Sequence, residues 1–342
     1  MLYILIAILF FGFLIAIHEL GHFITAKLCG VRVNEFAIGM GPLLLKKQGK
    51  ETLYSLRLLP IGGFCAMEGE DEATDDPRSF ARASAWRRFL ILVAGAAMNF
   101  LAGLLILLIL FSPAQASNTA VIDSFAAGCP AAEQGYLQPG DEILKIDGHL
   151  VLIYDDISML LSRGNGETVD LVIRRDGEKL KLEDVPMALA VYEDNGVSRE
   201  RYGLNFSVAE SGFLRNVNIA FRTSLDFVRM VWFGLEDLFS GAAGLKDMSG
   251  PIGIVNAMSE VGEASVSRLA ALLNLLYFGA FIAINLAVMN LLPIPALDGG
   301  RIFFLIVNVI LSRVIRRQIP GKYEGYVHLA GMALLLLLML VV

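Results

Sequence analysis

The chain has 342 residues, of which 56% are hydrophobic and 18% are charged, and its mean hydropathy is +0.62. This composition excludes an ordinary soluble enzyme, in which about half of the residues are apolar and about a quarter are charged. A net charge of −6 and the lack of a basic tract argue against a nucleic-acid partner. The three cysteines form no C-x-x-C pair and predict no disulfide framework.

The apolar residues are concentrated in blocks that are almost free of charged side chains. The blocks cover residues 1–26, 89–122, 269–297 and 325–342. Because a helix needs about 20 apolar residues to cross a bilayer, we expect one transmembrane helix in each block. The first block lacks a basic start and a small-residue cleavage site, so we interpret it as a retained span and not as a signal peptide.

The first block contains the stretch HELGH, which places His18, Glu19 and His22 inside a predicted span. Residues four apart lie on one face of a helix, so both imidazoles can reach one zinc ion, with Glu19 beside the metal-bound water as general base. The alternative is a pair of core histidines satisfied by hydrogen bonds. An ionisable group at the centre of a bilayer costs about 2.5–3.5 kcal/mol, which favours the metal site.

Lysine and arginine gather in two connectors, one between the first two blocks and one before the last block. The positive-inside rule therefore places both connectors in the cytoplasm. The same rule places both chain termini and the long region 113–268 outside the cytoplasm.

The region between the second and third blocks predicts a soluble domain of strands and a helix over residues 117–209. Residues 168–185 alternate apolar and polar side chains around Asp176-Gly177, which is typical of a hairpin. Residues 134–151 predict a short strand between two turns, and residues 154–164 suit a helix that stops at a glycine.

Two further stretches are helical in pattern but do not fit a span. Residues 213–235 are apolar, yet their charged side chains fall on one helical face, which predicts an amphipathic helix lying on the membrane. Residues 301–313 are too short to cross a bilayer, so we expect a buried or interfacial helix there.

A catalytic zinc ion needs a third protein ligand besides the two histidines. One candidate is Glu35, which falls in a region that the pattern predicts to be a loop. The other is Asp298, which ends the third apolar block on the same predicted side of the bilayer as His22. We favour Asp298 because of this shared depth, although it also suits a helix N-cap before two glycines. His328 is interpreted as a packed or interfacial histidine.

Three features of the chain carry a resemblance to a known family: HELGH, the stretch NLLPIPALDGG at residues 290–300, and the soluble domain between the second and third blocks. The chain resembles the site-2 protease family of intramembrane zinc metalloproteases, in particular its bacterial members. The resemblance covers essentially the whole chain. It implies a Zn²⁺ cofactor held by His18, His22 and Asp298, with Glu19 as the catalytic base. It also implies that Asn290 contacts the backbone of the substrate.

The resemblance gives meaning to two further segments. Residues 51–70 predict two strands around residues 60–63, which in the family resemble a membrane-reentrant β-loop, so we expect Gly63 and Phe64 near the substrate. A plain cytoplasmic hairpin is the alternative. The stretch GAAMN at residues 95–99 resembles the family's G-x-x-x-N motif. In it Gly95 permits close helix approach, and Asn99 offers either a substrate contact or a packing contact.

The soluble domain is similar to a PDZ domain with one copy in this chain, where better-known relatives carry two. Tyr202, Gly203 and Leu204 resemble its carboxylate-binding loop, which would take a peptide C-terminus. Alternatively, the domain is a steric gate that admits substrates already trimmed outside the cell.

The expected fold is therefore a polytopic α-helical membrane protein with four transmembrane helices, an inserted extracytoplasmic α+β PDZ-like domain and a membrane-reentrant β-loop. Its expected parts are two spans and the β-loop in 1–116, the PDZ-like domain in 117–209, a membrane-surface amphipathic helix region in 210–262, and the remaining two spans in 263–342.

The resemblance implies an endopeptidase that cuts transmembrane segments of single-span membrane proteins within the lipid bilayer. Such substrates include anti-sigma factors and remnant signal peptides, after a first extracytoplasmic cut. We expect a multi-pass protein of the bacterial cell membrane, with its active site towards the cytoplasm. The alternative is a non-proteolytic receptor or scaffold that uses the PDZ-like domain for binding.

Overall fold

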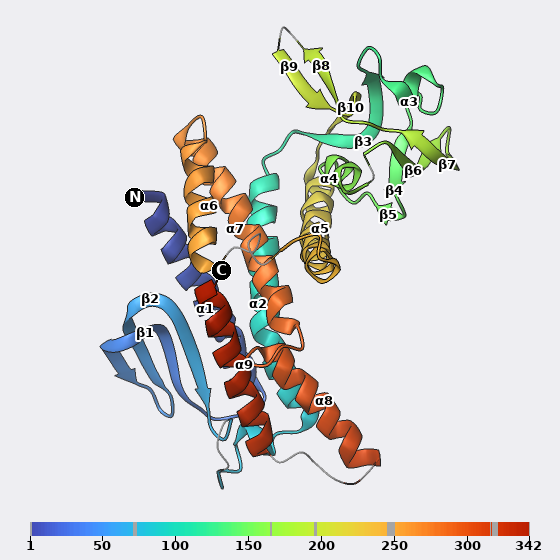
Figure 1. Cartoon of the computed structure of the whole chain (residues 1–342). Helices are drawn as coiled ribbons and strands as arrows, with labels where there is room; N and C mark the ends of the chain where they lie inside the picture. The colour runs from blue at the N-terminus through green and yellow to red at the C-terminus, as the bar shows by residue number, and fades with distance from the viewer. Residues whose placement is uncertain are drawn as a thin grey trace. The chain divides into compact units, whose positions relative to one another are not determined.

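The computed structural model describes residues 2–70, 74–164, 166–194, 197–244, 250–314, 316 and 321–341. The chain divides into two compact units, one of residues 1–107 with 227–342 and one of residues 108–226. Figure 1 labels their helices and strands in chain order. The stretch SGPIGI at residues 249–254 is a further feature that resembles the site-2 protease family. Its first residue, Ser249, lies outside the described residues, as does Arg317 of the basic connector before the last apolar block.

Three helices in the described residues are long and apolar enough to cross a membrane. They are α1 (Leu2–Leu28), α2 (Ala85–Phe111) and α7 (Arg268–Leu291). These helices confirm three of the expected spans. Helix α9 (Gly321–Val341) carries a shorter apolar stretch, Tyr323–Leu337. Helix α1 ends where Gly30 takes a φ of +77°, the left-handed conformation that commonly terminates helices.

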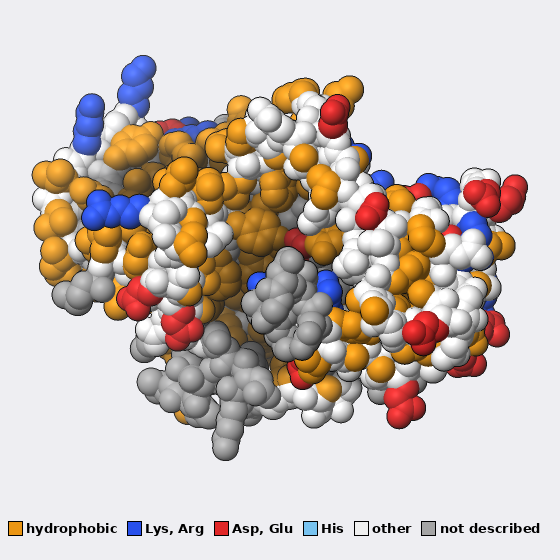
Figure 2. Space-filling view, turned by 90° about the horizontal axis from the view of Figure 1, so that it is seen from above, with side chains coloured by type: hydrophobic (Ala, Val, Ile, Leu, Met, Phe, Trp, Pro, Cys, Tyr) orange, Lys and Arg blue, Asp and Glu red, His pale blue; other side chains and the backbone are white. Residues whose placement is uncertain are grey.

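Many large apolar side chains on these helices are exposed, as expected where lipid replaces water. On α1 the exposed residues recur about one helical turn apart: Leu2, Leu5, Leu9 and Phe13. Figure 2 shows the contrast, because hydrophobic side chains cover much of the visible face of the first unit, whereas charged side chains are frequent on the second.

Glycines let the helices of the first unit approach one another closely. A Cβ atom at Gly21 of α1 would lie 2.4 Å from the carbonyl oxygen of Ala94 in α2, and one at Gly279 of α7 would lie 2.5 Å from the ring of Phe10. Small residues at such crossings permit close van der Waals packing, which drives helix association in membranes. The ligand-bearing helix α1 is therefore tightly held by two neighbours.

The region predicted as a membrane-surface helix contains two helices, α5 (Phe213–Ser240) and α6 (Pro251–Glu263). Met258 of α6 is 1% exposed and belongs to a buried cluster with Leu14 of α1 and Leu275 of α7. Helix α6 thus packs against the spans. The sequence interpretation did not predict this packing of α6, because it was based on the charge pattern of residues 213–235 alone.

The first unit also contains two long strands, β1 (Val33–Gln48) and β2 (Leu53–Met67) (Figure 1). The expected break at residues 60–63 is a bend within β2, where Gly62 takes a φ of +94°. Both halves of β2 pair with residues 35–38 of β1, residues 53–56 on one side and 63–66 on the other. The prediction of a loop around Glu35 is therefore wrong, since Glu35 lies within this sheet.

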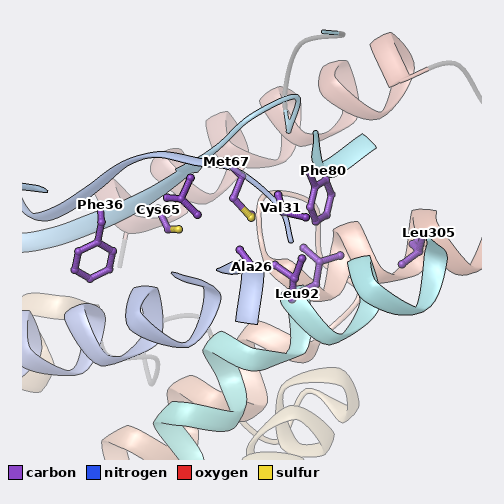
Figure 3. Close-up of a cluster of buried hydrophobic side chains, with 10 residues drawn as sticks. Ala26, Val31, Phe36, Cys65, Met67, Phe80, Leu92 and Leu305 are labelled. Carbon is purple, nitrogen blue, oxygen red and sulfur yellow. The ribbon is translucent and has the colours of Figure 1, made fainter. Parts of the chain in front are cut away.

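A buried cluster joins the sheet to the helices that carry the candidate ligands (Figure 3). Phe36 of β1 and Met67 of β2 pack in it with Ala26 of α1, Leu92 of α2 and Leu305 of α8 (Asp298–Val314). The existence of α8 confirms the predicted short helix. Burying such a side chain stabilises the fold by about 1.5–3 kcal/mol, so the cluster fixes the sheet against the helices.

A polar network holds the turn of the sheet at the end of α1. Lys27 pairs with Glu51 and donates a hydrogen bond of 2.8 Å to Thr52 Oγ1, while Thr52 donates one of 2.7 Å to the carbonyl oxygen of Val33. The hydrogen bonds from Lys27 and Arg78 lower the pKa of Glu51 to about 2, so this carboxylate stays charged at physiological pH.

The second unit is built around a six-stranded sheet in which the five main strands follow the order β10-β3-β4-β6-β7 and β5 pairs with β4. Its elements are β3 (Ala116–Phe125), α3 (Pro130–Glu133), β4 (Glu142–Ile146), β5 (His149–Leu150), α4 (Asp156–Arg163), β6 (Thr168–Arg175), β7 (Glu178–Pro186), β8 (Ala190–Asp194), β9 (Val197–Arg201) and β10 (Leu204–Glu210). Helix α4 and the β6–β7 hairpin, whose ends pair Arg175 with Glu178, confirm the predicted elements. The separate β8–β9 hairpin was not predicted.

Candidate metal centre

Two helices bring three potential metal ligands together in the first unit. His18 and His22 lie on one face of α1, and their Nε2 atoms are 3.1 Å apart. Asp298, the first residue of α8, places Oδ2 3.1 Å from Nε2 of His18 and 3.3 Å from Nε2 of His22. These residues form the one group in the described part of the chain that could hold a metal ion through histidine, cysteine or carboxylate atoms.

The spacing of these atoms suits a zinc ion. Tetrahedral zinc binds imidazole nitrogen and carboxylate oxygen at about 2.0–2.2 Å, so two ligands of one ion lie roughly 3.3–3.5 Å apart. The three observed separations are close to this value. Oδ2 of Asp298 is buried and receives no conventional hydrogen bond within the described residues. A cation held by these three ligand atoms would compensate this carboxylate, and zinc with three protein ligands would leave one coordination position for water or substrate.

A hydrogen bond from the other ring nitrogen of His22, Nδ1, orients the imidazole for metal binding. Nδ1 of His22 lies 2.8 Å from the carbonyl oxygen of Ile91 in α2. A carbonyl oxygen only accepts hydrogen bonds, so Nδ1 carries the proton and the lone pair of Nε2 faces the other ligands. Outer partners of this kind fix the tautomer of a metal-binding histidine.

His18 has its own supporting partner in Asn99 of α2. The amide nitrogen of Asn99 lies 3.4 Å from Nδ1 of His18, and its Oδ1 atom is buried without a hydrogen-bond partner in the described structure. Exchanging the amide oxygen and nitrogen, which are assigned by their contacts, lets Oδ1 accept the proton of His18 Nδ1. The contact supports His18, a role that differs from the two predicted for Asn99, a substrate contact or a packing contact.

Gly95 of α2 lies directly against the two histidines. A Cβ atom at Gly95 would be 2.4 Å from Nε2 of His22 and 2.7 Å from Nε2 of His18. The missing side chain therefore leaves the space in which the imidazoles meet the metal. Sequence reasoning found Gly95 through the G-x-x-x-N pattern but assigned it only to helix packing.

We expect Gly95→Ala to reduce zinc binding strongly, because the added methyl group displaces the two imidazole nitrogens. The measurement is the zinc content of purified protein by elemental analysis. Gly234→Ala is the matched control, since a Cβ at Gly234 of α5 meets nothing within 4 Å. Full zinc occupancy in Gly95→Ala would show that the histidines meet the metal elsewhere.

Glu19 lies beside the ligand group but does not belong to it. A Cβ atom at Gly63 of β2 would be 3.5 Å from Cγ of Glu19, and Cys65 of the same strand is a near neighbour of the Glu19 carboxylate. Glu19 therefore lies between the metal-binding triangle and strand β2. This is where a general base could reach a water molecule and a substrate paired with that strand.

The remaining predicted residues lie in the β1–β2 sheet, at the end of α7 and in the second unit. Phe64 of β2 lies under the guanidinium of Arg57, 5.0 Å from the ring centroid, and Asn290 lies in the last turn of α7. Tyr202, Gly203 and Leu204 belong to the second unit, at the start of β10. Glu35 accepts hydrogen bonds of 2.6 Å from Ser55 and 2.8 Å from Arg57, and it is not among the three clustered ligand residues.

The two histidines and Glu19 lie on α1, a helix apolar enough to span a membrane, and Asp298 of the short helix α8 completes the triangle beside them. This arrangement defines the class of intramembrane zinc metalloproteases. The model of Peptidase family M50 matches residues 6–338, and the chain belongs to this family. It is a multi-pass membrane protein and a zinc-dependent protease of the site-2 type, with Zn²⁺ as its cofactor.

Three relatives illustrate the similarity. The chain is 38% identical to a "Putative zinc metalloprotease" of Clostridium perfringens, over all of this chain and 97% of the relative. It is 38% identical to one of the same description from Clostridium acetobutylicum, over 99% of this chain and 95% of the relative. It is also 29% identical to the regulator of sigma-W protease RasP of Bacillus subtilis, over 98% of this chain and 96% of the relative.

Proposed function

We propose that this protein cleaves the transmembrane segments of membrane proteins, with His18, His22 and Asp298 as zinc ligands and Glu19 as general base. The observation that carries the proposal is the convergence of the three ligand atoms within 3.3 Å of one another in apolar helices beside Glu19. Zinc supplies a Lewis acid that polarises the scissile carbonyl group and acidifies water. Glu19 takes a proton from the attacking water and returns it to the amine nitrogen that leaves.

The sheet supports a binding mode for the substrate. A transmembrane helix satisfies its own backbone hydrogen bonds, so its peptide bonds are accessible only after local unwinding. Residues 63–66 pair with β1 on one side, and within the described residues no strand pairs with their other side. An unwound substrate segment would add there as a further strand, with Gly63 and Phe64 beneath it.

This strand addition would bring the scissile peptide near Glu19, which adjoins Gly63 and Cys65. Asn290 would contact the substrate backbone from α7. Apolar side chains are exposed on the sheet, among them Leu43, Leu44 and Leu45, which favours a membrane-reentrant β-loop over a cytoplasmic hairpin.

The proposed topology includes a fourth span and a cytoplasmic active site. Helix α9 is the candidate for the fourth span, and the basic residues of the connector after α1 favour the cytoplasm for that end of the helix. His22 and Asp298 then lie near the cytoplasmic side, while both termini and the second unit face outwards. The relatives named above are bacterial proteins, so the membrane is the bacterial cell membrane.

The second unit is proposed to be a single PDZ-like domain over residues 117–209. The alignment with RasP extends over 417 positions, more than the 342 residues of this chain, as expected if RasP carries an additional segment. Gly203 takes a φ of +76°, and a Cβ there would be 2.7 Å from the hydroxyl group of Tyr192. Tyr192 is 8% exposed, and this burial raises its pKa. A buried tyrosine against the Tyr202–Gly203–Leu204 loop favours a steric gate over an open carboxylate pocket.

The substrates are proposed to be single-span membrane proteins, such as an anti-sigma factor or a remnant signal peptide after a first extracytoplasmic cut. The name of RasP, a regulator of sigma-W, supports this class. The alternative of a non-proteolytic receptor or scaffold is less well supported, because it gives no use to the arrangement of Glu19 beside the three ligands.

We expect a strong metal chelator to stop cleavage of a model single-span substrate by the purified protein in detergent, and added zinc to restore it. The physical reason is that neither Glu19 nor the sheet polarises the carbonyl group without the ion. The measurement is the appearance of the cleaved substrate fragment. Unchanged cleavage after complete removal of zinc would contradict the proposed function.

A further inference from the structure

The segment between α7 and α8 directs the candidate ligand Asp298 towards the histidines. Its backbone includes Ala296, which takes a φ of +77°. This left-handed conformation is uncommon for a residue with a Cβ atom, and it persists only where the surrounding structure holds it. Ala296 comes two residues before Asp298, the first residue of α8. A contact that fixes the backbone at Ala296 therefore also fixes the start of α8 and the position of the Asp298 carboxylate.

His328 of α9 holds this turn. The backbone N–H of Ala296 donates a hydrogen bond of 2.9 Å to Nδ1 of His328. Because Nδ1 accepts, the neutral imidazole carries its proton on Nε2, and Nε2 lies 4.0 Å from Oε1 of Glu324 one turn earlier on α9. The ring of Phe304 in α8 lies 5.8 Å away, between centroids.

Gly300 and Gly331 allow close packing around the contact between His328 and Ala296. A Cβ atom at Gly300 of α8 would lie 3.2 Å from Cε1 of His328. A Cβ atom at Gly331 of α9 would lie 2.3 Å from Cβ of Pro295 and 2.9 Å from its carbonyl oxygen. Helix α9 therefore packs directly on residues 295–296, and the imidazole fills the space between α8 and α9.

We propose that His328 is a positioning residue for the third zinc ligand. By accepting the hydrogen bond from Ala296 N–H, His328 holds the left-handed turn that places Oδ2 of Asp298 within 3.3 Å of both histidine nitrogens. His328 is not itself one of the clustered ligands in the described residues, because its Nδ1 atom is engaged by the backbone. The inference rests on the proposed role of Asp298 as a ligand.

The test is the zinc affinity of the purified full-length protein, measured by competition with a chromophoric chelator. We expect His328→Ala to weaken zinc binding roughly 10- to 100-fold, as is typical for loss of an outer partner of a metal ligand. His328→Asn should restore binding to within about threefold, because Oδ1 of asparagine can take the place of Nδ1 as acceptor. Wild-type affinity in a folded His328→Ala protein would overturn the proposal, as would equal losses in the alanine and asparagine variants.

A second pair of variants tests the same contact without removing the imidazole. Gly331→Ala pushes α9 away from Pro295 and should weaken zinc binding, whereas Gly325→Ala on the same helix meets nothing within 4 Å and should not. Equal zinc affinity in this pair would overturn the proposal even if His328→Ala fails to fold.

A double variant separates failure of this inference from failure of the proposed ligand set. Where Asp298→Asn has already weakened zinc binding, adding His328→Ala should cause little further loss, because both changes act through the same ligand. A full additional loss would overturn the positioning role. If Asp298→Asn alone leaves zinc affinity unchanged, the proposed ligand itself is wrong.

Discussion

Glu19→Gln is expected to keep its zinc but to lose cleavage of a transmembrane substrate, with the rate falling by about 100- to 10,000-fold. Glutamine keeps the size of the side chain and its place beside Gly63 and Cys65, so the ligand triangle is undisturbed. It cannot take the proton of the attacking water. The measurements are zinc content by elemental analysis and cleavage of a model substrate in liposomes.

Glu260→Gln is the matched control for this experiment, because Glu260 is an exposed glutamate of α6 away from the ligand residues. It should retain both zinc and activity. Zinc-dependent cleavage at the wild-type rate by Glu19→Gln would rule out Glu19 as the general base. Loss of zinc from that variant would instead mean that Glu19 acts as a ligand.

Asp298→Asn is expected to lower zinc affinity by more than the roughly 10- to 100-fold that loss of an outer partner costs. The amide retains an oxygen atom but removes the negative charge that two neutral imidazoles cannot supply. Zinc content after dialysis against a weak chelator measures the effect, and cleavage should fall with it.

Glu35→Gln distinguishes the two ligands that the sequence left as alternatives. Glu35 is already bound by Ser55 and Arg57, so its substitution should leave zinc bound. Retention of zinc by Asp298→Asn together with its loss from Glu35→Gln would transfer the third ligand to Glu35 and remove the structural basis for the proposed site.

The principal error of the sequence interpretation concerns the segment that follows α1. Its pattern predicted a loop around Glu35 and then two strands within residues 51–70. The structure instead has two long strands, β1 and β2, that pair twice over residues 35–38. Alternation of apolar and polar residues along the chain reveals a strand with one buried and one solvent-exposed face. Here apolar side chains are exposed as well as buried, so the period-two signal is lost and pairing alone defines the strands.

The sequence by itself determined the features that depend on neighbours along the chain. The three spans follow from the lengths of uncharged apolar blocks, and His18 and His22 share a face because a helix repeats every 3.6 residues. The turns of the second unit, such as Asp176-Gly177, are equally local, since residues that tolerate positive φ mark them.

Only the tertiary structure decided which distant groups complete the centre. It brings Asp298 of α8 to the histidines of α1, sets Gly95 and Asn99 of α2 against their rings, and places His328 of α9 behind the turn at Ala296. These contacts join segments that lie 32 or more residues apart along the chain, and no periodicity relates them. Their positions depend on how the helices pack, which is a property of side-chain shape summed over many neighbours.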